Sequence, residues 1–127
     1  MVEFNNQTDY EFDLSDLKSL VKKALPDEAK LSVAFLPPEE IRKFNERYRN
    51  KKGPTDVLSF ESDREYIGEV LICPKVVKKQ AKQHGLEFED EIRRVLIHGV
   101  LHILGYDHKD PEDKKRMRNK EEELLSC

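Results

Sequence analysis

Residues 95–108, VLIHGVLHILGYDH, decide the fold, because a helix over residues 95–104 is apolar almost all round. A helix of that composition is typical of a protein core. Two histidines interrupt the apolar run, His98 and His102. They are four residues apart, so they lie one turn apart on the same helix face, where both can bind one cation. The stretch therefore predicts a buried helix that carries a metal site.

A third histidine, His108, follows His102 after six residues. That offset would place it on another side of a continuous helix, but Gly105 is the type of residue that ends a helix in the left-handed conformation. The chain can then fold back and bring His108 to the same ion. The resulting pattern is the ligand frame of the metzincin zinc proteases, with Gly99 in place of their glutamate. Because that glutamate is the general base of those proteases, its absence argues against peptide hydrolysis.

Three protein ligands with an open fourth position are usual for catalytic zinc, whereas structural zinc is normally closed by four ligands. The pattern therefore predicts one Zn²⁺ ion on His98, His102 and His108. Two alternatives remain: the histidines are core residues with hydrogen-bond partners, or Cys73 is a fourth ligand and the zinc is structural. His84 has no such companions, and we expect it at the surface or at a helix end.

Composition narrows the class of protein. The 127 residues, 37% of them hydrophobic, predict one compact domain. Together with the histidine pattern, this predicts a single metal-dependent hydrolase domain over residues 1–127. Neither a long uncharged apolar run nor a signal-peptide pattern is present, which predicts a cytoplasmic protein without membrane contact. The only cysteines, Cys73 and Cys127, do not indicate a disulfide framework. A net charge of −3 excludes a global basic field, although basic residues cluster over residues 42–52 and 114–120.

Apolar periodicity and capping residues predict an α+β fold in which a small, mixed sheet packs against helices. One of these is the buried zinc-binding helix. We expect strands at the N-terminus and over residues 31–36, 57–60 and 67–73, the last two joined by a turn at residues 62–64 as a hairpin. We expect helices from a cap at Asp13 or Ser15 to Leu25, from Pro37 and Pro38 to Tyr48 with Ile41, Phe44 and Tyr48 on the apolar side, over residues 74–84 and 89–104, and after Asp110.

Four blocks of sequence resemble the YbeY-type endoribonucleases of bacteria. They are Tyr48-Arg49, Pro54-Thr-Asp-Val-Leu-Ser-Phe60, Gly68-Glu-Val70 and the histidine stretch with Gly105-Tyr-Asp107. The resemblance implies a single-strand-specific, zinc-dependent endoribonuclease that acts in small-subunit rRNA maturation and ribosome quality control. It also implies that the three histidines hold the zinc, and that the partners are single-stranded RNA, small-subunit rRNA and the ribosome or ribosomal proteins.

Arg49 matches an arginine that this family associates with activity, so the resemblance implies that it is a catalytic residue. A guanidinium can hold phosphate oxygens in a bidentate manner and stabilise charge that develops at phosphorus. Asp107 either orients a ligand histidine or shapes the turn. The chain departs from the family pattern at Glu61, where proline is frequent, and at Glu69, where aspartate is common.

Two other functions stay open. A metallohydrolase of a small-molecule substrate would use the same zinc site, but its activity should survive neutralisation of the basic run over residues 42–52. A non-catalytic ribosome-assembly module with structural zinc would show four protein ligands and unfold when the metal is removed. Salt-sensitive binding of single-stranded RNA would favour either RNA-directed function over the small-molecule one.

Overall fold

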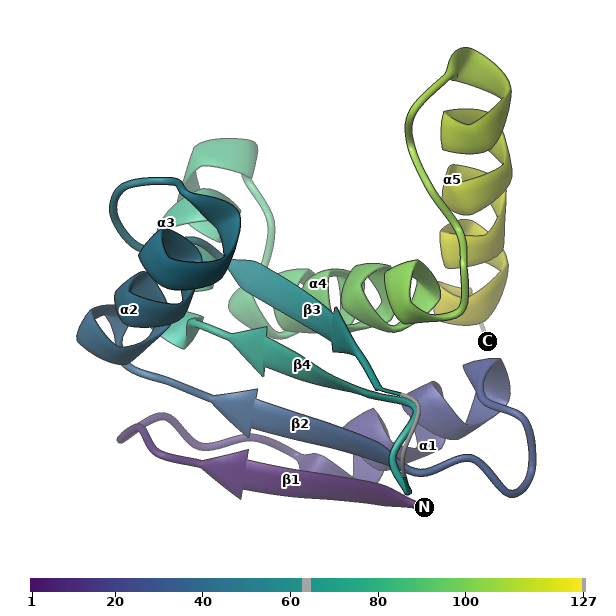
Figure 1. Ribbon diagram of the computed structural model, residues 1–127, viewed down its shortest axis with the longest axis horizontal. Helices are drawn as coiled ribbons and strands as arrows, with labels where there is room; N and C mark the ends of the chain where they lie inside the picture. Colours follow the sequence, from purple (N-terminus) through teal and green to yellow (C-terminus); the bar gives the residue numbers. More distant parts are fainter. Residues whose placement is uncertain (63–64, 127) are drawn as a thin grey trace.

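A computed structural model describes residues 1–62 and 65–126, which form an α+β fold around one four-stranded sheet (Figure 1). Each expected helix and strand is present, within a residue or two of its expected bounds. In chain order the elements are β1 (Val2–Asn6), α1 (Leu14–Ala24), β2 (Leu31–Phe35), α2 (Pro38–Arg49), β3 (Val57–Glu61), β4 (Gly68–Ile72), α3 (Pro74–His84), α4 (Phe88–Ile103) and α5 (Pro111–Leu125).

The sheet is mixed, as predicted. Its strand order is β1-β2-β4-β3, in which β1, β2 and β4 are parallel and β3 runs antiparallel to β4. The β3–β4 pair is the predicted hairpin, with Val57 opposite Ile72 and Glu61 opposite Gly68. Of the turn expected between them, residues 63 and 64 lie outside the described residues. This order leaves β3 at one edge of the sheet.

The helix α4 is the most buried helix of the fold and lies between two apolar layers. Side chains such as Leu96 and Val100 pack with β2, β4 and α1 in one core cluster, whereas Ile97 and Leu101 pack with α1 and α5 in another. Figure 1 shows α1 and α4 on one side of the sheet and α2 on the other. The apolar character of residues 95–104 therefore reflects burial on two sides, as the sequence predicts.

The helix α2 covers the opposite face of the sheet. Ile41 is completely buried there in a cluster with Leu58 and Leu71, and Phe44 packs against that cluster. Tyr48, predicted on the same apolar side, is instead 57% exposed. It lies in the last turn of α2, where its ring contacts Phe44 and Phe60 but is not covered.

Capping residues set the helix ends as predicted. The Asp13 side chain accepts a hydrogen bond from the backbone N–H of Asp16 at 3.1 Å, and the Asp110 side chain accepts one from the backbone N–H of Asp113 at 2.8 Å.

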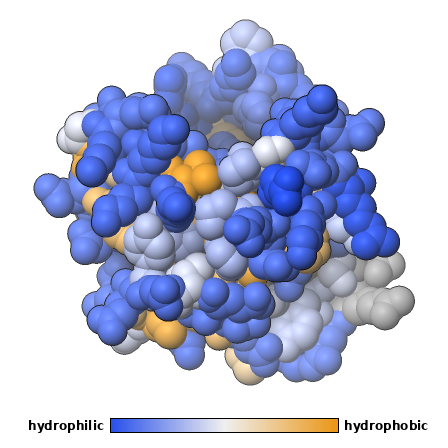
Figure 2. Space-filling model, turned by 90° about the vertical axis from the view of Figure 1, so that its left-hand side faces the viewer, coloured by the Kyte–Doolittle hydropathy of each residue, from blue (hydrophilic) through white to orange (hydrophobic). Residues whose placement is uncertain are grey.

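The end face formed by α2 and α3 is mainly hydrophilic, with apolar side chains in small separate patches (Figure 2). None of the helices in the described residues has the length and apolar character needed to cross a membrane.

Candidate active site

A cavity of about 350 Å³ brings together the four residues that the sequence singles out. Its walls come from the end of α2, the edge strand β3, the second half of α4 and the loop that follows α4. The lining residues are Tyr48, Arg49, Val57, Ser59, Phe60, His98, Gly99, His102 and His108. Because these segments are distant in the sequence, the cavity exists only when the sheet and α2 are both in place.

Three imidazole rings gather at this cavity. The ring centroid of His108 lies 6.1 Å from that of His98 and 6.5 Å from that of His102. The helix provides the spacing of the first two, and the chain reversal after α4 provides the third. Gly105 adopts a left-handed conformation with φ of 102°, and the backbone N–H of Tyr106 donates to the carbonyl of Leu101 at 3.0 Å. The predicted fold-back at this glycine is confirmed.

The three histidines are open to the cavity rather than enclosed in the core. His102 and His108 are exposed, and His98 is partly buried. Within residues 1–62 and 65–126, the rings of His102 and His108 have no hydrogen-bond partner. The alternative that these two are core histidines with partners is therefore wrong, since their ring nitrogens remain available to a ligand.

The donor set suits zinc, although the rings are spaced more widely than around a bound ion. Two imidazoles on one tetrahedral zinc at N–Zn distances of 2.0–2.1 Å have ring centroids about 5 Å apart. The rings here are about 1 Å further apart than that, and no group of three His, Cys, Asp or Glu side chains in the described residues has metal-holding geometry. Three imidazoles that line one open cavity are nevertheless the type of donor that zinc prefers, so the residues fit the ion chemically.

Glu121 of α5 contacts one of the three histidines, and the sequence analysis did not identify it. Its Oε1 lies 2.6 Å from Nδ1 of His98, and its side chain is only 14% exposed. A carboxylate can only accept, so we infer that Nδ1 of His98 carries the hydrogen and that Nε2 keeps its lone pair for the cavity. The sequence signal that could have identified Glu121 is Met117, an apolar residue of α5 that is buried beside α4. Glu121 follows Met117 by one helical turn, so both side chains lie on the same face of α5.

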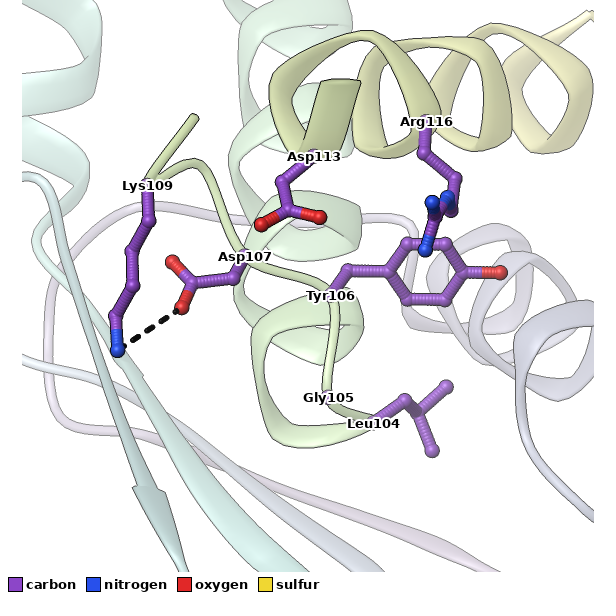
Figure 3. A pocket seen from close by; sticks show the side chains of 7 residues that line it. All are labelled: Leu104, Gly105, Tyr106, Asp107, Lys109, Asp113 and Arg116. Atoms are coloured by element: carbon purple, nitrogen blue, oxygen red, sulfur yellow. Dashed lines mark ion pairs between the residues drawn. The ribbon is translucent and has the colours of Figure 1, made fainter. Parts of the chain in front are cut away.

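Asp107 shapes the turn and does not orient a histidine ring. Its Oδ1 accepts a hydrogen bond from the backbone N–H of His108 at 2.6 Å, and its Oδ2 lies 3.8 Å from Nζ of Lys109. Figure 3 shows the side chain turned toward Lys109 on the wall of a separate hollow between this loop and α5. Of the two roles that the sequence allowed for Asp107, the structure supports the turn.

Gly99 occupies the position of the protease glutamate because α4 approaches the sheet closely there. A Cβ atom at this position would lie 2.9 Å from Cγ1 of Val70, 3.0 Å from Oγ of Ser59 and 3.2 Å from Cγ2 of Val57. The Ser59 hydroxyl also donates to the Gly99 carbonyl at 2.9 Å. The site has no room for any side chain here, which gives a packing reason for the departure from the protease pattern.

Arg49 is the last residue of α2 and reaches the cavity from the side opposite α4. It is exposed, and within the described residues its guanidinium has no ion-pair partner. The helix ends at Asn50, which is left-handed with φ of 58°, and the buried Asn45 donates to the carbonyl of Gly53 at 2.9 Å. These contacts fix the end of α2 and leave Arg49 free to bind an anion.

Two other sequence candidates lie away from the cavity. Cys73 is completely buried in the cluster between α2 and the sheet, where burial raises the pKa of its thiol, and it does not line the cavity. Its role as a fourth ligand has no support in this arrangement. His84 lies at the end of α3, as expected, with Nδ1 3.2 Å from Oε2 of Glu91. Cys127 lies outside the described residues.

The family described as Endoribonuclease YbeY matches residues 3–127 of the chain. An Endoribonuclease YbeY of Nautilia profundicola is 39% identical over 98% of this chain and 89% of its own length, and one of Staphylococcus carnosus is 38% identical over 88% and 82%. A solution structure of a Thermotoga maritima protein has a TM-score of 0.73 and 31% identity, and covers 99% of this chain and 87% of its own.

Proposed function

The chain belongs to the endoribonuclease YbeY family, and on that premise we propose that it is a zinc-dependent endoribonuclease specific for single-stranded RNA. One observation carries the proposal: three imidazoles and an unpaired guanidinium line one open cavity. This combination suits a metal ion beside a phosphate group. We further propose, from the family, that the substrate is small-subunit rRNA, and that the protein acts in the cytoplasm with the ribosome or ribosomal proteins in ribosome quality control.

His98, His102 and His108 are the residues that would hold Zn²⁺. When bound, the ion would supply Lewis acidity, which stabilises charge on phosphate oxygens and provides a nucleophile at neutral pH. The cavity lining contains no Asp, Glu or Cys among the described residues. That composition favours three protein ligands with an open position over a closed structural site, and hence the enzyme over the ribosome-assembly module.

Glu121 acts as a positioning residue. Its carboxylate holds the His98 ring through Nδ1, which fixes the tautomer and leaves Nε2 available to a metal ion. Arg49 acts on the substrate directly, because its planar guanidinium can donate two parallel hydrogen bonds to one phosphate. The negative charge that develops on the phosphate oxygens during cleavage would strengthen those hydrogen bonds.

Cleavage of a single-stranded rRNA fragment tests this function. Wild type, wild type treated with a chelator and His102→Ala are purified in parallel, with zinc content measured for each. We expect cleavage only by the zinc-containing wild type. His102 is exposed, so His102→Ala should change the free energy of unfolding of the metal-free chain by less than about 0.5 kcal/mol. Equal cleavage by wild type and His102→Ala would show a contaminating nuclease and refute the assignment.

Salt dependence and the basic run separate this function from hydrolysis of a small molecule. Binding of RNA releases counterions, so its affinity should fall steeply as the salt concentration rises. A variant with Arg47→Gln and Arg49→Gln should lose RNA cleavage. If that variant retained full hydrolytic activity on a small phosphodiester while wild type did not cleave RNA, the small-molecule reaction would replace the proposed one.

A further inference from the structure

An exposed aromatic ring stands at the rim of the cavity. Four large hydrophobic residues are exposed in the part of the chain that the structure describes, and Tyr48, at 57%, is the most exposed of them. It is also the only one of the four that lines the cavity with the histidines. An exposed apolar side chain at a binding site is generally a place where a bound ligand covers the protein surface.

Neighbouring rings hold Tyr48 in place. Its ring lies parallel to that of Phe44, with centroids 6.0 Å apart and an angle of 20°, and edge-on to that of Phe60 at 5.5 Å and 72°. Phe60 also contacts Phe44 at 6.4 Å. The ring is therefore supported from the helix and from the edge strand while part of it faces solvent. Such a ring forms a flat, preorganised surface.

Two arginines lie beside this ring. The guanidinium carbon of Arg47 lies 5.4 Å from the centroid of the Tyr48 ring, and Arg49 follows Tyr48 directly and lines the same cavity. A ligand that suits this combination has a flat π-face and a negative charge next to it. Nucleotides have both, since every base can stack on an aromatic ring and each base is joined to a phosphate.

We propose that Tyr48, supported by Phe60, is a stacking site for one unpaired base of the RNA substrate, adjacent to the phosphate that Arg49 binds. This proposal rests on the proposed function and adds the means of selecting single strands. A base within a duplex is stacked on its neighbours and cannot offer its face to a protein side chain. An unpaired base can turn out and cover the exposed part of the Tyr48 ring, in place of the exposed Arg47 side chain that lies over it.

The chain contains no tryptophan, so Tyr48→Trp provides a fluorescent reporter at this one position. Base stacking quenches indole emission. Titration of Tyr48→Trp with a 12-nucleotide oligouridylate should quench the emission, whereas the same length of double-stranded RNA should not. The matched control is Leu86→Trp, at a residue that is 46% exposed and does not line the cavity. Its emission should not respond to either RNA.

Binding of the labelled oligouridylate, measured by fluorescence anisotropy, gives the second readout. Stacking on one base is worth about 1–3 kcal/mol, which corresponds to about a 5- to 150-fold loss of affinity for Tyr48→Leu. Tyr48→Phe keeps the ring and should bind within about twofold of wild type. The circular dichroism of each variant should match that of wild type.

The outcomes separate the two proposals. If wild type binds and cleaves single-stranded RNA but Tyr48→Leu binds it equally well, the stacking site is wrong and the endoribonuclease function stands. If Tyr48→Leu loses affinity and Tyr48→Trp is quenched while wild type does not cleave RNA, the stacking site stands and catalysis is refuted. If wild type neither binds nor cleaves single-stranded RNA, both are overturned.

Discussion

Substitution of Gly99 by alanine has two opposite effects on the free energy of unfolding, one from helix propensity and one from packing. Alanine in place of a helical glycine normally stabilises a protein by up to about 1 kcal/mol. Here the new Cβ would lie 2.9 Å from Cγ1 of Val70, which is completely buried, and 3.0 Å from Oγ of Ser59. Overpacking of this kind costs about 1–3 kcal/mol. We therefore expect Gly99→Ala to lower the free energy of unfolding by about 1–2 kcal/mol, or to lower Tm by roughly 4–8 °C.

A double-mutant cycle with Val70→Ala identifies the cause. Val70→Ala alone should destabilise the protein, because it removes buried methyl groups from the core. In the double variant the Cβ at position 99 enters the space that Val70 leaves, so the combined loss should be smaller than the sum of the single losses by about 1–2 kcal/mol. Urea unfolding of the four proteins measures this. If Gly99→Ala proves stabilising, or if the two losses simply add, the close approach of α4 to the sheet is not what requires glycine at this position.

Three further predictions concern the site and its support. Arg49→Lys should lower kcat for RNA cleavage by about 10²–10³-fold, because the lysine cannot hold a phosphate in a bidentate manner, whereas the matched exposed change Arg42→Lys should not alter it. Glu121→Gln should weaken zinc affinity about 10- to 100-fold in a chelator competition without changing Tm of the metal-free chain, and equal zinc affinity in this variant and the exposed control Glu122→Gln would refute the positioning role. Burial raises the pKa of the Glu91 carboxyl, but hydrogen bonds and charge from its two partners, Arg94 and His84, outweigh burial and hold this pKa below its ordinary value of 4.5. The stability that the Glu91 carboxylate contributes is therefore present above pH 4.5 and is lost as the pH falls through the lowered pKa. Unfolding measured at pH 7 and pH 3 should therefore show a smaller difference for Glu91→Gln than for wild type.

Local signals predicted the helices well. The caps at Asp13 and Asp110 act within three residues of themselves, and Gly105 needs only its own backbone conformation to end α4. The spacing of His98 and His102 is likewise a property of one helix. Predictions of this kind hold because their physical cause is contained in a few consecutive residues.

Contacts between distant segments were harder to predict. The carboxylate partner of His98 is 23 residues away on another helix, and many acidic side chains of the chain were equally plausible from sequence alone. Tyr48 follows the apolar spacing of α2, yet it is exposed because it lies in the last turn of that helix, where Phe44 and Phe60 cover only part of its ring. The sequence shows only that Gly99 replaces the protease glutamate, whereas the reason, close packing against Val70, requires the structure.

The hydrogen bond between His98 and Glu121 also sets an order of events during synthesis. The chain is made from its N-terminus, at about 5–20 residues per second, so the 23 residues between them take roughly one to five seconds to be added. Until α5 emerges, the His98 ring has no carboxylate to fix its tautomer, although the rest of the cavity wall is already present in the chain. If the proposed function holds, a nascent chain without α5 is therefore expected to bind zinc less tightly than a chain in which α5 has folded. The helix α5, which lines no part of the cavity, thus delays the completed site until its own residues have folded against α4.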